Sequence, residues 1–424
     1  MGWLNPTWRK LRDNFKNNQR RGLMSCTLIQ IVSDEAMPNL LAAMALKPEN
    51  IIHLTTPRML KAAKALERAY GQAYFKTNVR FVQLAENPGM IEMNDTVAGV
   101  IADSQNPVVN ITGGTKLMSI GAYAAATRAK APSMYVDTAG DLFVDGLSGG
   151  DFAGLFSDGC SISRVSRQLT VNCVATANGV ERVSSGKKWT AYAAVADYLL
   201  RNQNEEGRCH DVVAKLLKDE PRGFMQARTY YSRLYEKCIR LPDEVCELGV
   251  GAGLFEKRDD GYYPNRSWLG EELRQEAQLP PYIMFKALEK ARWPFAFFNG
   301  NWWEVSVMRY LNEKGIYRDL RWSVEAGSRF SSSTDMEEDI LGIDSVNLLY
   351  VSCKRGGEKA KLSRVLEDVN SSARRIGGKF AHKMLAVYVD LNGSHRSRIE
   401  NRCRELHIDL LDRQTVASVP EFTE

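Results

Sequence analysis

The stretch VVNITGGTKLMSIGAYAAA, residues 108–126, contains the turn on which the fold of the N-terminal part depends. Its first residues have the pattern of a buried strand and the residues after Thr115 that of a helix, with Gly113 and Gly114 between them. Glycines let a ligand approach the backbone closely, and free N–H groups, a hydroxyl and Lys116 at a helix start favour phosphate. The stretch therefore predicts a strand, a phosphate-binding turn and a helix. A turn that only joins the strand to the helix stays open as the alternative.

Strand and helix patterns alternate from Cys26 to about Gly146. Such alternation predicts an α/β fold with a mostly parallel, doubly wound sheet, which binds ligands at the carboxyl ends of its strands. The first strand, TLIQIV, runs directly into Ser33 and Asp34, so we expect this loop and the glycine turn at the same edge. The predicted elements are strands 27–32, 50–56 and 106–112, helices 39–46, 58–75 and 116–129, and a closing pair of strands, 132–137 and 141–146.

Two common nucleotide-binding fingerprints are missing from this part of the sequence. The Walker spacing GxxxxGK[ST] is absent, and no GxGxxG follows the first strand, which disfavours a P-loop ATPase and an NAD-dependent enzyme. Instead, TLIQIVSDEAMPNLL, followed about eighty residues later by NITGGTKLMSIGAYAAA, resembles the CRISPR-associated Rossmann-fold (CARF) sensor domain. The resemblance implies a homodimer that binds a cyclic oligoadenylate, with cyclic tetra-adenylate favoured, across its two-fold axis. It places these residues at the ligand: Ser33, Asp34, Gly113, Gly114, Thr115, Lys116 and Met118.

A second polar cluster is predicted in DILGIDSVNLLYVSCK, residues 339–354. Side chains alternate along a strand, so Ser352 and Lys354 share a face, and a hairpin turn brings Asp339 alongside them. Upstream, FNGNWWEVSVMRYLNEKG has the pattern of a helix that carries Glu304. Carboxylates that hold Mg²⁺ or Mn²⁺, together with an ammonium that positions water or neutralises charge, suit metal-assisted phosphodiester cleavage. The alternative is an ordinary cross-strand salt bridge with Glu304 in solvent.

This cluster resembles the PD-(D/E)xK nuclease motif, with SxK in place of (D/E)xK. The resemblance implies a restriction-endonuclease-like α/β domain in which Glu304, Asp339, Ser352 and Lys354 are catalytic. It implies that the metal ion lies on Glu304, Asp339 and the backbone carbonyl of Cys353. Serine removes a negative charge and a strong metal ligand, so a fold retained only as a binding module is the alternative outcome.

Between the two units, three predicted helices precede GLFEKRDDGYYPN, in which Asp259, Asp260 and Gly261 mark a tight hairpin. Helices followed by a hairpin predict a winged-helix-like segment, although its basic residues are too scattered to identify a recognition helix. Further along, Trp302 and Trp303 are expected in the core. Three basic residues follow the strand that contains Lys354. They are expected either to contact a nucleic-acid backbone or to lie on a solvated helix face: Arg374, Arg375 and Lys379.

Length and composition limit the class of protein. At 424 residues the chain exceeds the size of one core, and its net charge of +5 permits a polyanionic partner without demanding one. No apolar run suits a membrane span, and the basic N-terminus lacks the apolar region of a secretory signal, so we expect a cytoplasmic protein. The predicted units are a basic extension (1–23), a CARF sensor (24–165), a connection (166–186), a winged-helix-like domain (187–284) and a nuclease domain (285–424).

The leading functional hypothesis is a metal-dependent nuclease that a cyclic oligoadenylate activates and that cleaves DNA, RNA or both in type III CRISPR defence. The alternative is a ligand-responsive regulator whose winged helix reads duplex DNA and whose nuclease-like domain is inactive. These hypotheses differ in one feature: whether Asp339 is needed for function.

Overall fold

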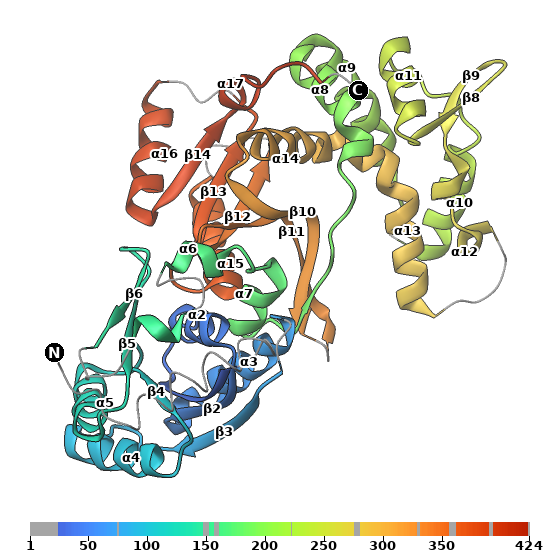
Figure 1. The fold of residues 1–424 in the computed structure, drawn as a ribbon. Helices are drawn as coiled ribbons and strands as arrows, with labels where there is room; N and C mark the ends of the chain where they lie inside the picture. The colour runs from blue at the N-terminus through green and yellow to red at the C-terminus, as the bar shows by residue number, and fades with distance from the viewer. Residues whose placement is uncertain are drawn as a thin grey trace.

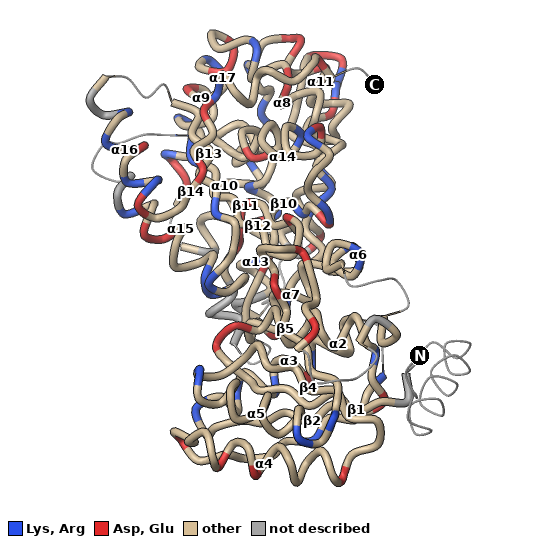
Figure 2. Tube along the Cα trace, turned by 60° about the vertical axis from the view of Figure 1, so that its left-hand side comes forward, with Lys and Arg blue, Asp and Glu red and all other residues tan. Residues whose placement is uncertain are grey.

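The structure is a computed structural model. It describes residues 24–73, 76–146, 152–156, 161–221, 223–274, 280–328, 331–355, 362–389 and 393–422. The chain forms a lower lobe from its N-terminal part and an upper lobe from the rest (Figure 1). Acidic and basic residues are spread along the length of both lobes (Figure 2). In the described ranges, no helix is long and apolar enough to cross a membrane.

The lower lobe is built on a six-stranded sheet with the order β3-β2-β1-β4-β5-β6. All neighbouring strands are parallel except β5 and β6, as the sequence pattern predicts. Strand β3 was not predicted, because a half-exposed edge strand shows only a weak apolar pattern. Helix α4 was not predicted either. The strands are β1 (Met24–Ile31), β2 (Pro48–Thr55), β3 (Asn78–Gln83), β4 (Pro107–Asn110), β5 (Ser133–Asp137) and β6 (Leu142–Asp145).

Helices cover both faces of this sheet. Helices α2 (Met37–Leu46), α3 (Leu60–Gln72) and α7 (Val171–Ala177) share one apolar core, and α4 (Met90–Ala102) and α5 (Lys116–Ala129) share the other. The sheet is therefore doubly wound. Because β1 lies between β2 and β4, the strand order reverses there, and this is the place where such sheets bind ligands.

The upper lobe contains a second six-stranded sheet with the order β14-β13-β12-β11-β10-β7. Strands β12, β13 and β14 are parallel, and β11, β10 and β7 continue the sheet in antiparallel fashion. Helix α14 lies over one face and α15 over the other. The elements are β7 (Arg182–Val183), β10 (Tyr317–Ser328), β11 (Ser331–Asp344), β12 (Asn347–Lys354), β13 (His382–Val387), β14 (Ile408–Asp412), α14 (Trp302–Lys314), α15 (Leu362–Gly377), α16 (Gly393–Leu406) and α17 (Arg413–Val416).

The segment 166–186 makes more contacts than a simple connection would. Its helix α7 is buried between α3 of the lower lobe and the second sheet, and its strand β7 pairs with β10. One apolar core therefore runs from the first sheet through α7 to the second sheet. The domain boundaries themselves stay a prediction.

The middle of the chain forms helices around a two-stranded hairpin. Arg258 pairs with Gly261 across the hairpin, so Asp259 and Asp260 form its turn as predicted. Helix α8 packs on α14, where the ion pair between Asp197 and Arg309 is buried. The elements are α8 (Ala193–Arg201), α9 (Gln203–Lys218), α10 (Phe224–Leu234), α11 (Asp243–Gly251), β8 (Phe255–Arg258), β9 (Gly261–Pro264), α12 (Glu271–Arg274) and α13 (Pro281–Ala296).

Candidate functional site

The two predicted loops of the lower lobe meet at the edge where β1 and β4 end. Gly113 lies so close to the end of β1 that a Cβ atom there would stand 2.1 Å from the Ile31 carbonyl oxygen and 3.6 Å from Ser33 Oγ. No other residue type fits this approach. Gly114 has a φ of 81°, in the left-handed region that favours glycine. Both glycines are therefore required for the turn, whether or not it binds a ligand.

The start of α5 presents polar groups to solvent beside this turn. Thr115 caps the helix, and its Oγ1 accepts a hydrogen bond from the Met118 amide at 3.4 Å. Lys116 is exposed at the first helical position, whereas the Met118 side chain is buried. On the facing loop, Asp34 is exposed and Ser33 Oγ lies 3.4 Å from the Glu35 amide. The structure thus brings together all the residues predicted to bind the cyclic oligoadenylate, with Met118 beneath the others.

Two buried asparagines hold these loops in place and were not identified from the sequence. Asn39 donates to the Ile31 carbonyl at 3.0 Å, and Asn110 donates to Asn39 Oδ1 at 3.3 Å. Asn110 Oδ1 accepts from the Thr112 amide and hydroxyl at 3.1 and 2.7 Å. For Asn110, its place at the end of an otherwise apolar strand was the available signal, since a buried amide needs such partners.

In the upper lobe, Asp339 is the centre of the second cluster. Its Oδ2 accepts hydrogen bonds from Ser352 Oγ at 3.2 Å, the Cys353 amide at 2.6 Å and Lys354 Nζ at 3.4 Å. No hydrogen bond to its Oδ1 is found in the described part of the chain. The side chains of Asp339 and Lys354 are 21% and 38% exposed, so solvent and small ligands reach both.

Glu304 lies in the first turn of α14 and is half-buried, with its carboxyl hydrogen-bonded to Trp322. Burial, together with the nearby negative charge of Asp339, raises the pKa of Glu304 to about 8, although a hydrogen bond from Trp322 opposes the shift. That bond runs from the indole Nε1 to Glu304 Oε2 at 2.8 Å. No sequence pattern indicated Trp322, because it reaches the site from β10, a strand that was not predicted.

The charge balance of the cluster also affects Lys354. Burial alone would lower the pKa of this lysine, but the neighbouring Asp339 carboxylate outweighs it and raises the pKa above its ordinary value. The ammonium is therefore charged at neutral pH. Burial and the same carboxylate raise the pKa of the Cys353 thiol, which keeps it an unreactive core side chain.

The donor set fits a hard divalent cation. Mg²⁺ and Mn²⁺ prefer carboxylate and carbonyl oxygens, and Glu304, Asp339 and the Cys353 carbonyl supply such atoms. Partial burial and the neighbouring Asp339 charge raise the pKa of the Glu304 carboxyl, and a bound cation would favour its ionised form. Among the described residues, no cluster of three or more acidic, histidine or cysteine side chains forms a metal site, so the carbonyl and water would complete the ligands.

Two of the three basic residues after the lysine strand have acidic partners. Arg375 on α15 donates to Glu338 Oε1 at 2.7 Å, and Tyr350 donates to the other oxygen of this buried carboxylate at 2.8 Å. Lys379 lies 3.4 Å from Glu35, which follows Ser33 and Asp34 in the lower lobe. The predicted role of Arg374, Arg375 and Lys379 on a nucleic-acid backbone stays a prediction.

The strand end at Lys354 is also fixed to the middle segment. Arg355 donates two hydrogen bonds, at 2.8 and 2.6 Å, to one oxygen of the buried Glu206 on α9. Trp302 and Trp303 are fully buried, which confirms that they belong to the core. The catalytic candidates thus lie on a rigid frame of strands and helices.

Comparisons with known proteins support the architecture. Residues 27–145 match the family model described as the Card1 CARF domain, which confirms the predicted CARF domain in this part. The fold resembles Can2 from Sulfobacillus thermosulfidooxidans in complex with cyclic tetra-adenylate, with a TM-score of 0.62, 18% identity, and 92% of this chain and 97% of that chain covered. It also resembles VC1899 from Vibrio cholerae, with a TM-score of 0.65, 13% identity, and coverages of 92% and 95%. No curated protein sequence matches the chain.

Proposed function

We propose that the protein is a nuclease of type III CRISPR defence that a cyclic oligoadenylate activates and that requires Mn²⁺ or Mg²⁺. The observation that carries this proposal is the cluster in the upper lobe. There, Asp339 accepts a hydrogen bond from the charged Lys354, and partial burial together with the negative charge of Asp339 raises the pKa of Glu304.

Each side chain of the cluster has a distinct role in phosphodiester cleavage. Asp339, Glu304 and the Cys353 carbonyl hold the cation, which supplies Lewis-acid activation of the phosphate and of water when bound. Lys354 places a fixed positive charge where negative charge develops on the scissile phosphate. Ser352 orients Asp339 through its hydroxyl at 3.2 Å, a weaker role than that of the acid usual at this motif position.

Cyclic tetra-adenylate is the proposed activator. The similar Can2 structure contains this ligand, and the loops of Ser33 and Gly113 form the ligand edge of the CARF domain here. A helix N-terminus with exposed Lys116 beside close-packed glycines suits phosphodiester groups. The activator must bind the active arrangement more tightly than the inactive one, since a ligand shifts an equilibrium only by its difference in affinity.

We further propose that the lower lobe forms the homodimer. Large apolar side chains are exposed next to the ligand edge: Leu117 and Ile120 on α5, and Met90 and Ile91 on α4. The two helices pack tightly, because Gly121 lies against the Met90 carbonyl. A contiguous exposed apolar area on two packed helices is typical of a protein–protein interface.

Cleavage assays test the proposal directly. The purified protein is incubated with labelled single-stranded DNA, RNA and supercoiled plasmid, with and without Mn²⁺ and cyclic tetra-adenylate. We expect cleavage only when both are present. Equal cleavage with and without the nucleotide would exclude the switch, and equal cleavage in EDTA would exclude the metal.

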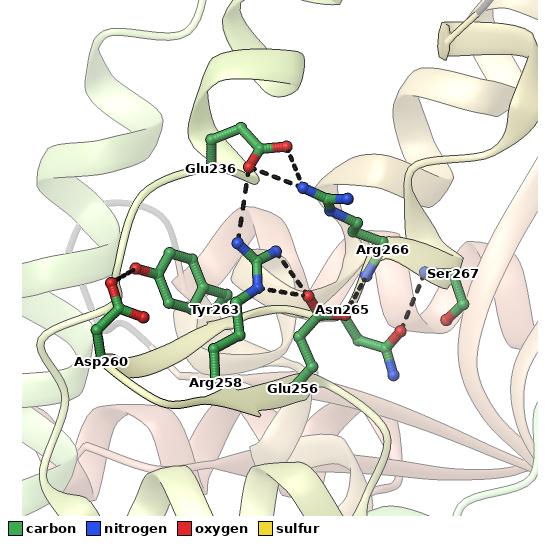
Figure 3. A network of polar contacts seen from close by, with 8 residues as sticks. All are labelled: Glu236, Glu256, Arg258, Asp260, Tyr263, Asn265, Arg266 and Ser267. Carbon is green, nitrogen blue, oxygen red and sulfur yellow. Dashed lines mark hydrogen bonds and ion pairs between the residues drawn. The ribbon is translucent and has the colours of Figure 1, made fainter.

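The alternative, a regulator that reads duplex DNA, is less well supported by the middle segment. The helix before the hairpin, α11, carries Asp243, Glu244 and Glu247, and no basic residue. The cations around the hairpin are engaged with acids: Arg258 with Glu256 at 2.6 Å, and Arg266 with Glu236 at 2.6 Å (Figure 3). Reading duplex DNA requires free cations on the phosphates, so this surface is poorly suited to it.

Lys116→Ala is expected to weaken the binding of cyclic tetra-adenylate about tenfold, because it removes an exposed charge at the helix start. Isothermal titration calorimetry measures the affinity, and the melting temperature should not change. The matched control is Lys130→Asn at the other end of α5, where the left-handed φ of 54° tolerates asparagine. Unchanged affinity in Lys116→Ala would remove this residue from the ligand site.

A further inference from the structure

A cavity of about 790 Å³ lies beside the catalytic cluster, between α13 and strands β10 and β11. Ligand pockets in proteins span about 300–1,000 Å³, so this cavity has room for a nucleotide. Glu337, two residues from Asp339 on β11, and Asn301, three residues before Glu304, both line it. Figure 1 shows α13 beside the long β10–β11 arm, with the segment before α8 running between them. The cavity is therefore next to the proposed site of cleavage.

The cavity has positively charged walls. Lys286 and Lys290 lie one helical turn apart on α13, both exposed, and Lys188 lies on the segment that crosses between α13 and the sheet. In the described ranges, no ion pair neutralises any of these three lysines. A fourth, Lys187, pairs with Glu337 at 3.1 Å. The three uncompensated ammonium groups suit an anionic ligand.

Aromatic rings form another part of the wall. The rings of Trp268 and Trp293 lie 6.2 Å apart, and Tyr192 lies 6.1 Å from Trp293. Trp268 is partly exposed. Trp293 is 7% exposed, and Lys187 Nζ lies 4.0 Å from the centroid of its ring, which leaves Trp268 as the more exposed ring. Exposed aromatic faces bind unpaired bases by stacking, and this contact tolerates any base.

Carboxylates of the cavity wall indicate which part of a nucleotide would lie inside it. Glu325 on β10 and Glu337 on β11 line the cavity from the sheet, and Glu289 lines it from α13, between Lys286 and Lys290. Such groups repel phosphate but accept hydrogen bonds from the amino groups of bases. The base therefore fits inside, while the phosphate fits on the lysines of α13.

We propose that this cavity binds an unpaired nucleotide next to the scissile phosphate, with its base on Trp268 and its phosphate on Lys286 and Lys290. This inference rests on the proposed nuclease function and adds the substrate class, single-stranded nucleic acid. A base stacks on a protein ring only when it has left its own helix, so an intact duplex cannot fill the cavity.

Binding in EDTA tests the inference without cleavage. Fluorescence anisotropy of a labelled twelve-nucleotide DNA strand is measured with the full-length protein and with Lys286→Ala/Lys290→Ala. We expect roughly tenfold weaker binding and a salt slope reduced by about 0.7, since the one phosphate held by these two lysines contributes about 0.7 on a single strand. Lys215→Ala/Lys218→Ala, a pair of exposed lysines on α9 outside the cavity, is the matched control and should bind like the wild type.

Trp268 provides a second, independent test. Trp268→Ala should weaken strand binding at least fivefold, and Trp268→Phe, which keeps a stacking face, should restore most of the affinity. A melting curve of each variant separates lost binding from lost folding. Wild-type affinity in the lysine double variant, or equal affinity for a blunt duplex of the same length, would overturn the inference.

A failure of the cavity assignment can be distinguished from a failure of the proposed nuclease function. If Asp339→Ala still cleaves while the cavity variants lose strand binding, the catalytic assignment fails and the cavity assignment stands. If Asp339→Ala is inactive while the cavity variants cleave single strands with unchanged KM, the cavity assignment fails alone.

Discussion

Replacing Lys354 by alanine is expected to lower the rate of activated cleavage at least a hundredfold, the usual cost of removing one preorganised group that stabilises transition-state charge. Asp339→Ala should have an effect of the same size, since Asp339 accepts from Ser352, Cys353 and Lys354 and is a proposed metal ligand. The initial rate on a labelled substrate, with saturating Mn²⁺ and cyclic tetra-adenylate, is the measurement.

The controls separate catalysis from folding. The ion pair between Lys354 and Asp339 is partly exposed, so its loss should cost only about 0–1 kcal/mol of folding free energy and leave activator binding unchanged. Ser352→Ala should lose less activity, because a hydroxyl is a weak metal ligand. Lys314→Ala, at the solvated end of α14, should retain full activity. If Lys354→Ala kept full metal-dependent cleavage, the assignment of the active site to this cluster would be wrong.

Glu304→Gln is expected to abolish cleavage and also to stabilise the metal-free protein at high pH. The pKa of Glu304 in the fold is about 8, whereas an unfolded chain gives it an ordinary value near 4.5. Between these two values the folded protein keeps a proton that the unfolded chain releases, so folding stability falls as the pH rises through this window. Glutamine carries no charge at any pH and its oxygen still accepts the Trp322 N–H.

Thermal unfolding in EDTA at several pH values tests this expectation. The melting temperature of Glu304→Gln should exceed that of the wild type by roughly 2–4 °C or more at pH 8.5, and the difference should shrink towards pH 5. Glu313→Gln, an exposed glutamate on the same helix, should show no such pH dependence. A difference that stays constant with pH would mean that Glu304 is not held protonated in the fold.

The alternation of strands and helices in the lower lobe could be predicted from the sequence alone. Apolar periodicity identifies elements that are buried, and β1, β4 and α5 are of this kind. It also predicted the glycine turn, because Gly113 and Gly114 occupy backbone positions that only glycine tolerates. The hairpin that joins β11 to β12 was also predicted from the sequence. Its residues are close in sequence, so a short turn fixes the register of the two strands.

The surroundings of each polar cluster depend on tertiary packing and could not be predicted from the sequence. Trp322 reaches Glu304 from a strand that shows no clear period, and Glu206 reaches Arg355 across almost 150 positions of sequence. The cavity beside Glu337 is likewise formed by segments far apart in the chain. Local patterns record which side chains avoid water, whereas the pKa of Glu304 and the walls of the cavity depend on which distant elements pack together. A single sequence contains no local signal for such contacts, because they arise from the packing of whole helices and sheets.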